Sequence, residues 1–510
     1  MKKGENIENL RHRAAPLEMT PHEFRALGYE TVDRIAGFLA SLPQRPVGPG
    51  ESVEEVRKLL VSGPLPEHGT HAADLLKETS DLLFDHSVFN GHPRFLAYIT
   101  SSAAPIGALG DLLAAAVNPN VGSFSLSPIA TEIEAQTVRW IAEMIGYPSN
   151  CGGLLVSGGN MANFVGFLAA RRAKASWDIR TSGIAGGGRT LRLYTSRETH
   201  TWIQKAADLF GLGTDSIRWI PTDAQLRMDP TLLQKQIRED KDKGDLPFLV
   251  IGTAGSVSTG ALDPLPALST ICREHGLWFH VDGAYGALAA VLPDASEDLK
   301  GLRDADSVAV DPHKWLYTPL EAGCALVRKQ QDLLDAFSYH PPYYHFDADG
   351  TELPINYYEM GMQNSRGFRA LKVWLALRQV GREGYVRMIA DDIALARELY
   401  RSIGAFPELQ AFTHGLSITT FRYVPKDLKP GEERIETYLN TLNAELLTRL
   451  QESGRVYLSN AVINGVFLLR ACVVNMRTSL TDIEALPHIV VDIGGETDRA
   501  IRPAQLKTTG

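Results

Sequence analysis

Apolar residues in the middle of the chain come in short continuous runs that alternate with stretches of helical periodicity. The runs cover residues 153–156, 192–194, 217–220, 248–253, 277–281, 307–310 and 324–327. Continuous apolarity is typical of strands in a parallel sheet that is covered on both faces. The region from 106 to 395 is therefore predicted to be an α/β domain with a mainly parallel, seven-stranded sheet.

The two ends of the chain follow other patterns. Thr20 and Pro21 form a helix start, apolar residues then recur every three or four positions, and a Pro/Gly-rich stretch begins at Ser41. We expect this arm to pack on a second subunit, because it buries little alone; a hairpin folded on its own chain is the alternative. At the other end, alternating segments at 414–423 and 464–474 flank a predicted helix at 433–452, which indicates a small α+β domain.

Composition excludes several classes of protein. Among 510 residues, 51 Lys and Arg face 60 Asp and Glu, a net charge of −9 without a concentrated basic surface, which argues against nucleic-acid binding. No apolar run reaches the roughly 18–20 residues of a membrane span, and no apolar run of a secretory signal follows the first lysines. The four scattered cysteines have no metal-ligand spacing, so we expect a reduced, cytoplasmic protein without a metal site.

Candidate chemistry follows the strand ends, where α/β sheets bind ligands. The run 153–156 ends in Ser157-Gly158-Gly159-Asn160 and leads directly into a predicted helix at 161–174. Glycines there let backbone amides approach an anion, and the helix dipole adds about 0.3–1 kcal/mol. Taken alone, the segment is explained better by an ordinary tight turn than by an anion site.

Two further strands end in charged residues. Asp282 follows the run 277–281 and, if buried, needs a cationic partner: an arginine, a metal or a protonated ring nitrogen; a helix cap is the alternative. Lys314 follows the run 307–310 after Asp311, Pro312 and His313, and a lysine in such a place suits Schiff-base chemistry, although most lysines are surface residues. The order of turn, aspartate and lysine on one sheet matches what pyridoxal phosphate requires for its phosphate, ring nitrogen and aldehyde.

The segments WFHVDGAYG from Trp278 and ADSVAVDPHKWLY from Ala305 resemble the group II pyridoxal-phosphate decarboxylases, the family of aromatic-L-amino-acid, histidine, tyrosine and glutamate decarboxylases. The similarity extends over nearly the whole chain, from residues 20–48 to the Arg366-Gly-Phe-Arg segment. It implies the pyridoxal-phosphate fold type I, which is aspartate-aminotransferase-like. It also implies an arm at 1–105 swapped within a homodimer, a large domain at 106–395 and a small domain at 396–510.

The resemblance also implies a role for each site residue. Lys314 forms the internal aldimine, Asp282 pairs with the pyridinium nitrogen, His200 stacks on one ring face, and Ala284 packs on the other. The phosphate contacts are Gly159, Asn160 and His313, and Ser256 lies near the ring hydroxyl. Asp311 departs from the asparagine common in animal members; since a carboxylate would repel the phosphate, we expect it to point away.

The reaction implied is loss of CO2 from an L-amino acid, giving a quinonoid carbanion that is protonated at Cα. Counting back from Arg366 makes Tyr357 the proton donor, on a predicted lid at 340–365. Members with phenylalanine at that position form aldehydes, so Tyr357 favours simple decarboxylation; the neighbouring Tyr358 or a mere packing role for Tyr357 are the alternatives.

Substrate preference is read from Tyr98, Ile99 and Thr100, expected to line the side-chain pocket with residues 120–124 of the partner subunit. Gly122 stands where animal aromatic decarboxylases carry phenylalanine, which would reshape the pocket. No arginine is predicted to bind a side-chain carboxylate, so an aromatic L-amino acid is favoured over glutamate, with an aliphatic diamino acid as the second choice.

Other activities share the same residues. An aldehyde synthase, a transaminase-like enzyme, a carbon–sulfur lyase and a non-catalytic cofactor-binding homologue are the alternatives. Lyases of that kind carry a catalytic cysteine on a loop, whereas Cys324 falls in a predicted strand. The presence of Asp282, His313, Lys314 and Tyr357 together argues against the non-catalytic alternative.

Overall fold

The computed structural model describes residues 10–13, 15–60, 63–339 and 354–506. Residues 1–89 form one compact unit and residues 90–510 another. The helices of the first unit are α2 (Pro21–Ser41), α3 (Val53–Leu59) and α4 (Ala72–Asp85).

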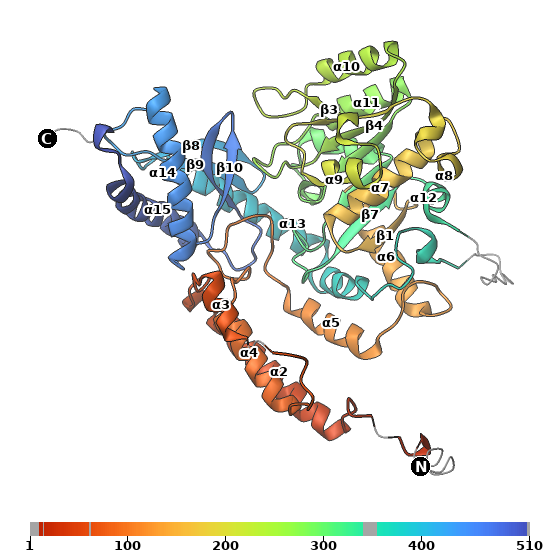
Figure 1. Ribbon diagram of the computed structural model, residues 1–510, viewed down its shortest axis with the longest axis horizontal. Helices are drawn as coiled ribbons and strands as arrows, with labels where there is room; N and C mark the ends of the chain where they lie inside the picture. Colours follow the sequence, from red (N-terminus) through yellow and green to blue (C-terminus); the bar gives the residue numbers. More distant parts are fainter. Residues whose placement is uncertain (1–9, 14, 61–62, 340–353, 507–510) are drawn as a thin grey trace. The chain divides into compact units, whose positions relative to one another are not determined.

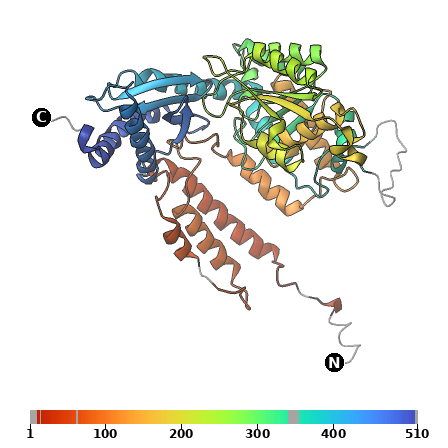
Figure 2. The same ribbon diagram turned by 45° about the horizontal axis from the view of Figure 1, so that its top comes forward.

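Helix α2 begins where the sequence predicts. The Thr20 hydroxyl accepts a hydrogen bond from the Glu23 backbone N–H, the Glu23 carboxylate accepts one from the Thr20 N–H, and Pro21 is the first helical residue. α2 and α4 lie side by side (Figure 2), with the rings of Phe38 and Phe84 stacked 4.5 Å apart. No residue of α2 is buried, which leaves an apolar helix face open.

The larger unit is built on a seven-stranded sheet in the order β1-β7-β6-β5-β4-β2-β3 (Figure 1). Its strands are β1 (Gly152–Val156), β2 (Leu191–Ser196), β3 (Ile217–Ile220), β4 (Leu246–Thr253), β5 (Trp278–Asp282), β6 (Ser307–Val310) and β7 (Gly323–Val327). All seven predicted strands are present within two residues of their expected bounds. Only β7 runs against its neighbours, so the prediction of a mainly parallel sheet is confirmed.

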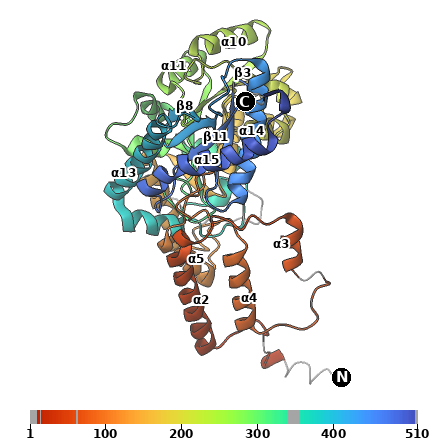
Figure 3. The same cartoon turned by 90° about the vertical axis from the view of Figure 1, so that its left-hand side faces the viewer.

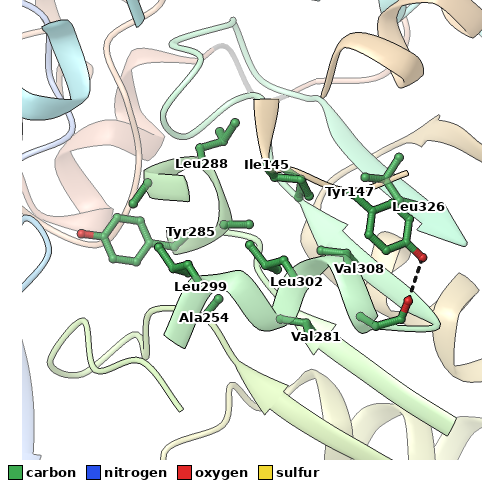
Figure 4. Packing of buried hydrophobic residues seen from close by; sticks show 14 of the residues in the cluster. Ile145, Tyr147, Ala254, Val281, Tyr285, Leu288, Leu299, Leu302, Val308 and Leu326 are labelled. Atoms are coloured by element: carbon green, nitrogen blue, oxygen red, sulfur yellow. Dashed lines mark hydrogen bonds between the residues drawn. The ribbon is translucent and has the colours of Figure 1, made fainter. Parts of the chain in front are cut away.

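Both faces of this sheet are buried, which explains the continuous apolar runs. In β4, Val250 belongs to one hydrophobic cluster, while Leu249 and Ile251 belong to the cluster on the opposite face. Figure 4 shows the first cluster, in which Val281 and Val308 of the sheet pack together with residues that lie outside its strands.

Helices cover each face. One face carries α7 (Gly159–Lys174), α9 (Trp202–Leu209) and α12 (Gln330–Phe337). The other carries α10 (Pro230–Asp242) and α11 (Leu265–His275), together with most of α6 (Pro128–Met144). Two further helices, α5 (Pro105–Val117) and the short α8 (Ile179–Ser182), complete this region.

A second, antiparallel sheet follows in the order β10-β11-β9-β8. Its strands are β8 (Leu409–Gly415), β9 (Ile418–Tyr423), β10 (Ser459–Ile463) and β11 (Val466–Cys472). The helices α13 (Ala370–Ile403), α14 (Glu433–Glu452) and α15 (Leu480–Ile501) pack against it (Figure 3). α14 has the predicted bounds, whereas the predicted strands at 414–423 and 464–474 each include part of a hairpin turn.

Residue 395 lies inside α13, so the boundary expected there falls within a helix. The division into an arm, a large domain and a small domain stays a prediction. No helix in the described part of the chain is both long and apolar enough to cross a bilayer.

Candidate active site

The turn after β1 is shaped by two glycines. Gly158 has φ +122°, a conformation that side chains with a Cβ rarely adopt. Gly159 is the first residue of α7, and a Cβ there would lie 2.7 Å from Asp311 Oδ2 and 3.2 Å from the Ala284 Cβ. The first amides of a helix have no partner within the helix, so this turn is suited to bind an anion.

Asp282, the last residue of β5, is held by other parts of the protein. It is 7% exposed; Oδ2 accepts a hydrogen bond from Trp202 Nε1 at 2.7 Å, and Oδ1 accepts one from the Ala284 N–H at 3.3 Å. Both oxygens are thus fixed. The carboxylate lines a cavity, where it is available to a cation.

Lys314 and two neighbours follow β6. The Lys314 Nζ lies 3.1 Å from Asp311 Oδ2, and His313 donates its Nδ1–H to the Ala322 carbonyl at 2.7 Å. Burial lowers the pKa of His313 and that of His200, in the latter case against the raising effect of Asp282. Both rings are therefore neutral near pH 7.

These groups share one cavity of about 660 Å³. Because β1, β2, β4, β5 and β6 run in one direction, the segments after them reach the same edge of the sheet. The predicted site residues that line the cavity are Tyr98, Ile99, Thr100, Gly159, Asn160, His200, Asp282, Ala284, His313 and Lys314.

Comparison with known proteins decides the family. Residues 54–423 match the model of the pyridoxal-dependent decarboxylase conserved domain. The chain belongs to the pyridoxal-dependent decarboxylases. It is 33% identical to an aromatic-L-amino-acid decarboxylase of Bacillus atrophaeus, over 92% of this chain and 94% of that protein.

Two further relatives show the range of the family. A phenylacetaldehyde synthase of Petunia hybrida is 30% identical over 92% of this chain and 93% of its own length. The crystal structure of Oryza sativa TDC with PLP and tryptamine superposes with a TM-score of 0.86 at 27% identity, covering 95% of this chain and 99% of that one. The fold is therefore that of the pyridoxal-phosphate decarboxylases, and pyridoxal phosphate is the cofactor.

The residues of this decarboxylase fit that cofactor. The glycine turn leaves room for a phosphate where a Cβ would collide with its neighbours. A buried carboxylate at Asp282 suits a protonated ring nitrogen, and Lys314 supplies the amine for the aldehyde. Among the described residues, no group of three or more His, Cys, Asp or Glu side chains could hold a metal ion.

Asp311 does not point away as expected. Its side chain is 3% exposed, lines the cavity next to Gly159, and forms an ion pair with Lys314. The expectation considered only repulsion from a phosphate and overlooked the lysine three residues further along the same turn.

Ser256 and Tyr357 are the two predicted site residues that do not line the cavity. The Ser256 hydroxyl is hydrogen-bonded to the Thr259 hydroxyl at 2.9 Å, while its neighbours Gly255, Val257 and Ser258 do line the cavity. The Ser256 hydroxyl thus bonds within its own loop, and its contact with the ring hydroxyl stays a prediction.

Tyr357 lies in the hydrophobic core. It is 1% exposed, and the Arg366 guanidinium lies 4.6 Å from the centre of its ring. Arg366 in turn forms a buried ion pair with Glu134. Residues 340–353 of the predicted lid lie outside the described residues, and the role of Tyr357 as proton donor stays a prediction.

Arg470 on β11 lines the cavity, although no arginine was among the site residues expected from the sequence. It is 2% exposed, and its Nη1 donates to the Tyr98 carbonyl and to the Ser459 hydroxyl, each at 3.0 Å. Among the described residues its Nε and Nη2 have no partner. A charged residue inside the apolar segment 466–474 was the available signal.

Proposed function

We propose that this enzyme decarboxylates an aromatic L-amino acid to the corresponding amine and CO2. The observation that carries the proposal is the convergence of Lys314, Asp282 and the glycine turn on one cavity that also presents Arg470, whose Nε and Nη2 have no partner among the described residues. The similarity to an aromatic-L-amino-acid decarboxylase supports the substrate class.

The residues of the chain divide the work. When bound, pyridoxal phosphate supplies an aldehyde for the amine of the substrate and a ring that accepts the electron pair of the broken bond. Lys314 holds the aldehyde carbon until the substrate amine replaces it. Asp282 keeps a proton on the ring nitrogen, and Gly159, Asn160 and His313 bind the phosphate.

His200 and Ala284 are proposed to contact the two faces of the ring. A neutral imidazole suits that position, because it adds no charge beside the ring nitrogen. Ser256 and Tyr357 receive no part in the proposal, because neither lines the cavity.

Arg470 is proposed to bind the carboxylate of the incoming amino acid. A buried guanidinium with two unpaired nitrogens is costly unless a ligand completes its hydrogen bonds. Tyr98, Ile99, Val257 and Leu320 give the same cavity apolar walls, which suits an aromatic side chain.

An aldehyde synthase is the second candidate. It is favoured by the similarity to a phenylacetaldehyde synthase and by the burial of Tyr357, which removes the sequence argument against it. In that reaction O2 and water are consumed, and the amino acid yields aldehyde, ammonia, CO2 and hydrogen peroxide.

The deciding experiment incubates the cofactor-loaded enzyme with a panel of L-amino acids and measures CO2, amine, aldehyde and peroxide together. Equal amounts of CO2 and amine from an aromatic substrate, without peroxide, support the proposal. Peroxide and aldehyde in step with CO2 move the assignment to the synthase. Turnover of glutamate or a diamino acid in preference to all aromatic substrates contradicts the substrate class.

A homodimer with a swapped arm belongs to the same proposal. Phe24, Tyr29, Val32 and Ile35 are exposed on α2 within the first unit, and such an apolar face gains stability when a second copy covers it. A cytoplasmic location is supported by the four cysteines, none of which forms a disulfide. Light scattering of the full chain, compared with a chain that begins at residue 90, tests the arm: loss of the dimer is expected.

A further inference from the structure

Asp311 and Asp282 lie in the same cavity, but different groups hold them. Asp282 receives its hydrogen bonds from Trp202 and Ala284. The Asp311 Oδ2 lies 3.1 Å from Lys314 Nζ and 3.7 Å from His313 Nε2. Its Oδ1 is buried and has no hydrogen-bond partner in the described part of the chain.

Asp311 lies beside both groups that the cofactor is expected to contact, the glycine turn and the Lys314 amine. A Cβ at Gly159 would lie 2.7 Å from Oδ2, so the carboxylate lies directly beside the first residue of α7. On its other side the carboxylate contacts the amine that must react with the aldehyde. His313 donates Nδ1–H to a carbonyl, and burial lowers its pKa, so Lys314 is the cation that balances Asp311.

The other ionisable groups around Lys314 do not replace that balance. His200 and Asp282 face it from the ends of β2 and β5, and Glu321 and Arg470 also line the cavity. Among the described residues, Asp311 forms an ion pair only with Lys314, since His313, at 3.7 Å, is neutral near pH 7. The carboxylate is therefore stabilised chiefly by a group whose charge is used when the cofactor binds.

We propose that Asp311 is a positioning residue that competes with the cofactor for Lys314 and for the glycine turn, and so makes the cofactor exchangeable. The inference rests on the proposed roles of Lys314 and of the turn. To react, Lys314 leaves the carboxylate and releases a proton to solvent; its nitrogen then bonds to the aldehyde carbon, and the aldehyde oxygen departs as water. The phosphate, in turn, must bind beside a carboxylate of the same sign.

The test is the affinity of the cofactor-free protein for pyridoxal phosphate and for pyridoxal, which lacks the phosphate. Both are titrated by absorbance and tryptophan fluorescence, in the parent protein and in Asp311→Asn. Asparagine keeps the shape and removes the charge. We expect about tenfold tighter binding of pyridoxal phosphate, a smaller gain of about threefold for pyridoxal, and slower loss of cofactor on dialysis.

If Asp311 competes with the cofactor, replacing it strengthens the binding of pyridoxal phosphate. If its role is merely structural, replacing it does not. Asp282→Asn is the matched control, an identical exchange in the same cavity, and it is expected to weaken binding because the ring nitrogen loses its partner. Asp311→Ser, which also removes the charge, is expected to bind more tightly than the parent and guards against a folding defect of one variant.

Unchanged or weaker binding of pyridoxal phosphate by both folded Asp311 variants would overturn the proposal. Equal gains for pyridoxal and pyridoxal phosphate would overturn the competition at the turn. Failure of the proposed function has another signature, since Lys314→Ala would then still form the covalent complex, detected by borohydride reduction and mass spectrometry.

Discussion

Lys314, Asp282 and the turn at Gly159 lie just after three strands of one sheet, whereas Tyr98, Ser459 and Arg470 reach the same cavity from a loop and from the second sheet. We refer to residues 157–160, Asp282, His313 and Lys314 as the cofactor side. Residues 98–100, Ser459, Asn460 and Arg470 form the substrate side. The cofactor side forms because the segments after parallel strands reach the same edge of a sheet. The substrate side depends on how the two sheets are placed next to each other.

Because the two sides come from different parts of the fold, cofactor binding and substrate binding can be altered separately. A substitution on the cofactor side is expected to change the spectrum of the bound cofactor. A substitution on the substrate side is expected to change KM and leave that spectrum intact. The four predictions below test this separation, beginning with the largest effect.

Replacing Lys314 by alanine is expected to abolish the covalent cofactor band and lower kcat/KM by about 10³-fold or more, because the amine that holds the aldehyde is lost. Absorbance spectra and initial rates of CO2 release measure both. Lys300→Ala, an exposed lysine in a 3₁₀ helix, is the control and should retain band and rate. A Lys314 variant with the original band would end the assignment of the cofactor side.

Replacing Arg470 by methionine is expected to raise KM by about 10- to 100-fold, because a charged hydrogen bond to the substrate carboxylate is lost. Methionine fills similar space, so the cofactor band should be unchanged. Arg470→Lys keeps the charge but loses the paired N–H donors of the guanidinium. Its KM, measured by steady-state kinetics, should therefore lie between those of the parent enzyme and Arg470→Met. A changed cofactor band with an unchanged KM would place Arg470 on the cofactor side instead.

Asp392 on α13 fixes two aromatic residues that follow Lys314 of the cofactor side. It accepts hydrogen bonds from Trp315 Nε1 at 3.0 Å and from the Tyr317 hydroxyl at 2.6 Å, both just after Lys314. Burial raises its pKa to about 7, and the two hydrogen bonds oppose that rise. The folded protein therefore holds a proton that the unfolded chain releases above about pH 4.

Stability from this group is present at low pH and is lost as the pH rises through about 7. Between pH 6 and pH 8 the cofactor-free protein should lose about 1 kcal/mol of unfolding free energy that Asp392→Asn does not lose. Urea unfolding of both proteins at the two pH values measures the difference. If the unfolding free energies of the two proteins change equally between pH 6 and pH 8, Asp392 is already ionised over this range.

Replacing Tyr357 by phenylalanine is expected to have the smallest effect. Because the ring is buried beside Arg366, kcat should stay within about threefold and the ratio of peroxide to CO2 should not change. Product analysis of the variant beside the parent enzyme measures this. The appearance of aldehyde and peroxide in the variant alone would restore Tyr357 as the proton donor.

The cofactor side could be predicted because its signals are local in the sequence. Each of its strands is a continuous apolar run, and the reactive residue follows within four positions of the strand end. The resemblance to a known family then selects one cofactor among several possibilities, and the family assignment is confirmed over residues 54–423.

The substrate side could not be predicted, because its contacts join distant parts of the chain. The hydrogen bond from Arg470 to the Tyr98 carbonyl joins residues that are 372 positions apart in the sequence. The residues next to each of them do not predict this pairing. Tyr357, the residue found by counting back from Arg366, belongs to a buried unit with Arg366 and Glu134, and its role as proton donor stays a prediction.

The register of the second sheet has a consequence for how such enzymes diversify. Arg470 on β11 lies opposite Ser459 on β10 and Thr420 on β9, and side chains along a strand alternate between its two faces. A one-residue insertion or deletion in the hairpin between β10 and β11 that shifts β11 would turn Arg470 away and present an apolar neighbour in its place. Binding of the substrate carboxylate can therefore be altered through the length of one hairpin, while the cofactor side on the other sheet stays unchanged.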